Sequence, residues 1–87
     1  MNKKNELKKK TAEYQSLFIR EPNDLPPARF GKTLYIRQEH HERISQIVHV
    51  IAKGDISLSG YVDNVLTEHF KNYWDEIIQS FDEKRLY

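Results

Sequence analysis

The feature that most constrains this chain is a single alternating segment with no second one to pair with. In "KTLYIR", residues 32–37, Leu34 and Ile36 face one way while the residues between them face the other, which is typical of a β-strand. Backbone amides and carbonyls of a strand need partners, and no other stretch of the sequence is a convincing strand. The pattern therefore predicts antiparallel pairing with the same strand of a second molecule, across a two-fold axis.

Two helical patterns follow the strand almost without a loop. Residues 39–53 carry an apolar stripe at three- and four-residue spacing, and Gly54 is placed to end that helix. A second helix is predicted from Leu58 to about Ser80. Ser57 is its expected N-cap, with a side-chain oxygen able to accept from the amide of Ser59 or Gly60, and Asp55 is the alternative cap.

Length and composition indicate one small domain that needs a partner. The chain has 87 residues, no cysteine, 31% charged residues and a mean hydropathy of -0.79. Without cysteine, no disulfide can stabilise the fold. The other values predict a helical protein that buries more apolar surface by associating with a partner. We expect a cytoplasmic protein with no membrane partner, because no apolar run approaches the ~20 residues of a span and the first residues lack the apolar core of a signal peptide.

Charge is distributed unevenly along the chain. Residues 1–37 carry nine lysine and arginine residues against four acidic ones, whereas residues 38–87 carry five against nine. A basic front half indicates an anionic partner, with an ordinary solvated tail as the alternative. We divide the chain into residues 1–28, a basic arm with a short helix over residues 11–20 and a proline-rich linker, and residues 29–87, a dimerisation and DNA-binding domain.

The order of basic arm, strand, helix, short turn and Ser-capped helix over residues 31–75 resembles the ribbon-helix-helix fold of Arc/MetJ-type repressors. The resemblance implies a mainly α-helical protein with one short strand and two helices. It also implies an intertwined homodimer whose two strands form an antiparallel ribbon that enters the major groove of DNA. We therefore expect a sequence-specific protein binding double-stranded DNA.

The expected site residues follow from this arrangement. Outward side chains of a ribbon reach base edges, so the base-contacting residues are Thr33, Tyr35 and Arg37. Phosphate contacts are expected from Arg29 and Lys32 and, as the resemblance implies, from the start of the second helix at Ser57, Leu58 and Ser59. The expected dimer core comprises the apolar positions Leu34, Ile36, Ile44, Ile47, Val48, Ile51, Val62, Val65, Leu66, Phe70, Tyr73 and Trp74.

A second resemblance covers most of residues 14–78. The segment is similar to an uncharacterised protein family encoded on conjugative transposons of gut anaerobic bacteria. The matching residues are Lys32, Tyr35, Ile36, His41 to Ile44, Ser57, Tyr61 and Asp63 to Leu66. The resemblance implies a mobile-element setting, in which the protein acts as a transcriptional regulator or as an accessory factor at a transfer origin.

The histidines and the sequence motifs predict neither a metal site nor a catalytic site. No two of the histidines His40, His41, His49 and His69 have the i, i+4 spacing of a helical zinc site, so we expect no metal. No glycine-rich phosphate loop or nucleophile elbow is present. We therefore expect neither catalysis nor a cofactor nor a small-molecule substrate.

Two alternatives remain open. The aromatic end of the second helix, with Tyr73, Trp74, Ile77 and Phe81, indicates either dimer packing or docking of another conjugation protein. The second interpretation makes the chain an interaction module of a conjugation or toxin–antitoxin system without DNA binding. A monomer is the structural rival, with the strand folded back on the N-terminal segment.

Overall fold

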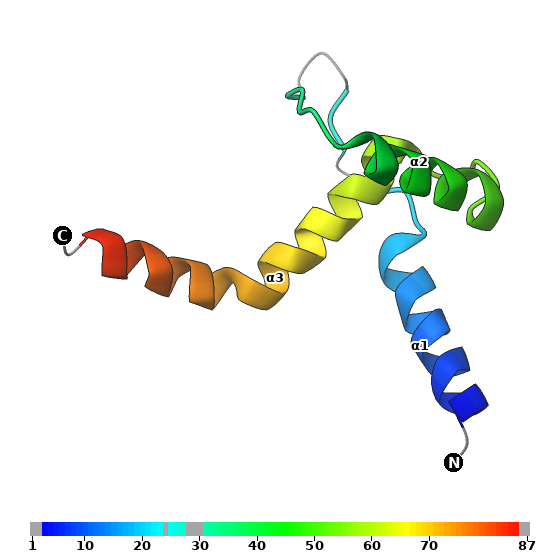
Figure 1. Ribbon diagram of the computed structural model, residues 1–87, viewed down its shortest axis with the longest axis horizontal. Coiled ribbons are helices and arrows are strands. Elements are labelled where there is room, and N and C mark those ends of the chain that lie inside the picture. Colours follow the sequence, from blue (N-terminus) through cyan, green and yellow to red (C-terminus); the bar gives the residue numbers. More distant parts are fainter. Residues whose placement is uncertain (1–2, 24, 28–30, 86–87) are drawn as a thin grey trace.

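The protein is an open, three-armed arrangement of helices (Figure 1). A computed structural model describes residues 3–23, 25–27 and 31–85. The elements are α1 (Lys3–Phe18), α2 (Gln38–Gln46), the π-helix η2 (Ile47–Ile51) and α3 (Leu58–Arg85). The radius of gyration is 16.4 Å, against about 12 Å for a compact domain of this length.

Residues 32–37 do not form a strand. Over the described ranges there is no β-strand at all, and residues 31–37 are irregular and fully on the surface. Leu34 is 80% exposed and Tyr35 96% exposed. Alternation gives a segment two faces, but a strand exists only where a neighbouring backbone accepts its hydrogen bonds. The predicted ribbon-helix-helix fold, with its antiparallel ribbon and intertwined dimer, is therefore wrong.

Helix α1 is longer than the sequence pattern indicated. It begins at Lys3 rather than near residue 11, because lysine, glutamate and leucine are strong helix formers and no glycine or proline interrupts them before Pro22. None of its residues is fully buried. Only its C-terminal end docks, where the Tyr14 and Phe18 rings lie 5.4 Å apart and face α3.

The helix predicted for residues 39–53 is interrupted by a widened turn. After α2 the chain forms η2, and the Ala52 amide donates to the Ile47 carbonyl at 3.1 Å. The extra residue in a π-turn rotates the residues after it about the helix axis, so Ala52 is buried and Ile51 points outward. Lys53 and Gly54 then take positive φ angles of 53° and 80°, which confirms Gly54 as the end of this helix.

The core is small and lies where the three arms meet. It consists of Val48, Ala52, Ile56 and Tyr61, with Tyr14, Phe18, Ile19, Ile44, Ile47 and Leu58 packed around it. From this junction, the N-terminal half of α1 and the C-terminal half of α3 diverge (Figure 1). Both halves therefore lack intramolecular support, which makes their surfaces the places to look for function.

Candidate functional site

The start of α3 is joined to the segment after α1 by the Glu21 carboxylate. The Ser57 amide donates to Glu21 Oε2 at 3.2 Å, and the Ser57 hydroxyl donates to Glu21 Oε1 at 2.9 Å. The Gly60 amide donates to Ser57 Oγ at 2.9 Å, which confirms Ser57 as the N-cap. A carboxylate here is stabilised by the free amides and the positive end of the helix dipole.

Two further contacts fix α1 against α3. Asn64, which is 3% exposed, donates from Nδ2 to the carbonyls of Phe18 at 3.0 Å and Arg20 at 2.6 Å. The Tyr14 and Tyr61 hydroxyls share a hydrogen bond of 2.9 Å. Burial raises the pKa of Tyr61 above its usual value, and the hydrogen bond to Tyr14 raises it further. These contacts set the angle at which the two long helices diverge.

The expected phosphate-contacting residues that the structure describes fall at this junction or beside it. The Ser57 amide is bonded to Glu21, so a carboxylate of the same chain takes up that donor at the start of α3. Leu58 is half-buried, whereas Ser59 and Lys32 are exposed. Arg29 lies outside the described residues.

The expected base-contacting residues lie on the exposed segment before α2. Thr33, Tyr35 and Arg37 are all exposed, and Arg37 Nη1 lies 3.6 Å from Glu39 Oε1. In Figure 1 this segment projects on the side of the junction opposite α1. A single chain therefore does not bring these three side chains together with the basic residues of α1.

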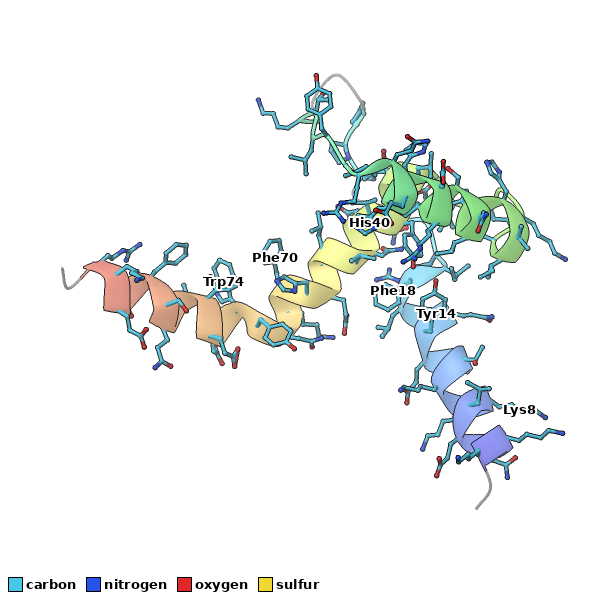
Figure 2. The ribbon with its side chains drawn as sticks, viewed as in Figure 1. Lys8, Tyr14, Phe18, His40, Phe70 and Trp74 are labelled. Atoms are coloured by element: carbon cyan, nitrogen blue, oxygen red, sulfur yellow. The ribbon has the colours of Figure 1, made fainter. Side chains whose placement is uncertain are left out.

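The first turns of α1 form the strongest basic surface. We call Lys3, Lys4, Lys8, Lys9 and Lys10 the lysine end. All five are exposed, and Lys8 points outward from the helix (Figure 2). No carboxylate of the described residues lies within ion-pair distance of them. Their charge is therefore available to an external anion.

Exposed apolar side chains continue along α3 from Leu66 to Phe81. We call this surface the aromatic face and define it as Leu66, Phe70, Tyr73, Trp74, Ile77 and Phe81. Phe70 is 46%, Trp74 52% and Phe81 50% exposed. Phe70 and Trp74 rise from the same side of the helix, away from α1 (Figure 2), with ring centroids 6.4 Å apart in an edge-on arrangement. Contiguous apolar surface of this kind marks an interaction site.

An open groove continues the aromatic face toward the junction. Its volume is ≈ 480 Å³. Its apolar lining comes from Leu34 and Ile36 before α2, Ile44 in α2, and Val62 and Leu66 in α3. Polar side chains also reach it, namely Lys32, His41, Ser59 and Asp63. The irregular segment 31–37 thus supplies apolar side chains to a surface shared with α3.

The expected dimer-core residues divide between the junction and the surface. Val48 is buried, and Ile44, Ile47 and Val62 are half-buried. The remaining eight are exposed: Leu34, Ile36, Ile51, Val65, Leu66, Phe70, Tyr73 and Trp74.

The structural roles of Glu21 and Asn64 were missed from the sequence. Their partners lie 36 to 46 positions away. The one local signal is Asn64 itself, a poor helix former placed among the apolar positions of an amphipathic helix.

Neither a metal centre nor a membrane span is found in the part of the chain that the structure describes. Over those ranges, no three histidine or acidic side chains cluster in a way that could hold a metal ion. Within the same residues, no helix is both long and apolar enough to cross a bilayer.

The fold and its surfaces define a small helical protein with a basic first helix and an unpartnered aromatic face on its last. The chain belongs to a family described as a protein of unknown function, DUF3408, whose model matches residues 1–84. No curated protein and no solved structure matches the chain.

Proposed function

We propose that the chain is a double-stranded-DNA-binding protein that acts as a homodimer and holds DNA phosphates with the lysine end of α1. The observation that carries this proposal is the set of five exposed lysines on the projecting first turns of α1, unpaired among the described residues. Lysines that neutralise phosphates release condensed counterions, and that release supplies nearly all of the non-specific affinity of a protein for DNA.

Sequence selectivity in this proposal comes from Thr33, Tyr35 and Arg37. They are presented by an exposed segment rather than by a ribbon. Arginine binds guanine with two hydrogen bonds, and threonine and tyrosine offer hydroxyls to base edges or phosphates. This segment and the lysine end lie apart in one protomer (Figure 1). Both can therefore contact the same DNA in only two ways: the duplex runs across the molecule from one to the other, or a second copy of the chain supplies one of the two contacts.

The biological setting proposed is a mobile element in the cytoplasm. The resemblance to proteins encoded on conjugative transposons supports a role in transcriptional regulation or at a transfer origin. The role is one of binding, without catalysis or a cofactor.

Replacing lysines on α1 tests the proposal. We expect the triple change K8Q, K9Q and K10Q to weaken duplex binding by at least about tenfold at moderate salt, because each lysine that contacts a phosphate adds one released counterion. Fluorescence anisotropy with a labelled duplex measures the affinity. Lys71→Gln on α3 is the matched control and should bind like the unchanged chain. Equal binding by the triple variant would contradict the proposal.

A second candidate function is a protein-interaction module that does not bind DNA. The exposed aromatic face, on the acidic part of the chain, favours it. The two candidates separate in the same assay, since the interaction module gives no anisotropy change with duplex at low salt.

A further inference from the structure

We propose that the aromatic face pairs with the same face of a second copy, with the two α3 helices antiparallel and Phe81 of each copy seated in the groove of the other. This proposal specifies the homodimer of the proposed function, on which it rests, and it does not require DNA binding.

The spacing of the aromatic face makes it complementary to itself in the antiparallel direction. Leu66, Phe70, Tyr73 and Ile77 are four, three and four residues apart, which is the repeat of helices that pack side by side. When two such helices run in opposite directions about a centre between Lys71 and Asn72, three apolar pairs form. They are Phe70 with Tyr73, Leu66 with Ile77, and Val62 with Phe81.

The same register places Phe81 at the groove. Val62 and Leu66 are groove residues, and Leu34, Ile36 and Ile44 line the space beside them. Phe81 and Ile77 of the second copy therefore meet the apolar hollow that continues the aromatic face. This also accounts for Leu34 and Ile36, which are exposed in the isolated chain.

The polar residues flanking the aromatic face are compatible with this register. His69 of one copy lies across from Glu76 of the other, so an imidazole N–H can donate to a carboxylate, and the two-fold axis makes this pair twice. Glu68, Asp75 and Asp82 fall on the outer side of both helices, where water screens their repulsion. These three acidic residues therefore do not oppose pairing, and the one acidic side chain that the described groove contains is that of Asp63.

The area available is sufficient for a stable dimer. Phe70, Tyr73, Trp74 and Phe81 each expose about half of their surface. A fully buried aromatic side chain removes about 150–250 Å² from water, so covering these four exposed halves buries roughly 300–500 Å² per copy. With Leu66, Ile77 and the groove residues added, the total for two copies exceeds the ~1,000 Å² expected of a biological interface.

The first test measures the oligomeric state of the full chain without DNA. We expect sedimentation velocity to show a dimer at micromolar concentration. Phe70→Asp should weaken dimerisation at least about 100-fold, because each dimer then buries two carboxylates at its centre. Gln79→Asp adds the same charge on the opposite side of α3 and should leave the dimer intact. Circular dichroism checks that both variants keep their helices.

The second test measures the direction of pairing. The chain has no cysteine, so Lys71→Cys and Asp82→Cys each give a single spin-labelling site, and both sites lie on the outer side of the pair. In the antiparallel register the two copies of residue 71 are about 2 Å apart along the axis and those of residue 82 about 30 Å. We therefore expect a clearly longer electron–electron distance for Asp82→Cys.

Three results would overturn the proposal. The first is a monomer at 50 μM or above (a concentration on the order of 10⁻⁵ M, where an interface of this size should assemble). The second is equal distances for the two labelling sites, which indicates parallel helices. The third is a dimer that survives Phe70→Asp but is lost on replacing Lys8, Lys9 and Lys10, which indicates that α1 makes the contact.

Discussion

Gly60 is required where the Glu21 carboxylate closes over the first turn of α3. A Cβ atom at residue 60 would collide with Glu21 Oε1 and would stand 3.0 Å from both Pro22 Cδ and Ser57 Oγ. We expect Gly60→Ala to lower the free energy of unfolding by about 1–3 kcal/mol, because the carboxylate and its hydrogen bonds must shift. Thermal or urea unfolding measures this. Ser59→Ala, one position away and exposed, is the control, and a Gly60→Ala variant as stable as that control would contradict this account of the junction.

Tyr61 makes stability depend on pH in the alkaline range. Its pKa is raised in the folded protein, by burial and by the hydrogen bond to Tyr14. Folding therefore favours the neutral phenol, so the stabilisation is complete below about pH 10 and is lost as the pH rises above the value of the unfolded chain. We expect urea unfolding to show falling stability above pH 10, with a shallower decline in Tyr61→Phe. The same decline in both proteins would exclude Tyr61 as the cause.

At the scale of elements, one of the contacts that hold α1 to α3 is made by the buried amide of Asn64. Asn64 Nδ2 donates to two carbonyls, that of Phe18 at the end of α1 and that of Arg20 just after it. We expect Asn64→Ala to lower the free energy of unfolding by about 1–3 kcal/mol, since both hydrogen bonds of this buried amide are lost. The exchange rate of backbone amide hydrogens should then increase at the end of α1 near Phe18, while the rate in the middle of α3 stays the same. Unchanged exchange at the end of α1 would show that the apolar contacts alone hold the helix.

The elements differ in how far the sequence could predict them. The start of α3 and the turn at Gly54 were predictable, because an N-cap serine and a terminating glycine act on their own neighbours. The strand over residues 32–37 was mispredicted. Alternation can be seen in the segment alone, but a strand also needs a neighbouring strand to take up its backbone hydrogen bonds. The π-turn η2 was not predicted. As a result, Ile51 was expected in the core, whereas Ala52 is the residue buried there.

The candidate site was only partly predictable from the sequence. The apolar spacing of α3 is visible in the sequence, but the exposure of Phe70 and Trp74 follows only from the way α1 and α3 diverge (Figure 2). The roles of Glu21 and Asn64 depend on contacts distant in sequence, which no local pattern encodes.

At the scale of the whole molecule, the open shape separates the two surfaces to which we assign the proposed functions. The core occupies the junction, the lysine end projects along one arm, and the aromatic face projects along another (Figure 1). Pairing through α3 therefore leaves both lysine ends free, which gives one dimer two basic arms for a single duplex. Two linked contacts raise affinity well beyond that of either one alone.

The most direct test of DNA binding through the lysine end is the salt dependence of duplex affinity for the unchanged chain. The slope of log affinity against log salt is about −0.9 for each phosphate neutralised, so five lysines from one copy or ten from two predict a slope of roughly −4 to −9. Anisotropy titrations from 50 to 200 mM salt, on the order of the range in which counterion release dominates, measure it. A steep slope in this range is the predicted result, and a slope near zero, or no binding at the lowest salt, would contradict the account.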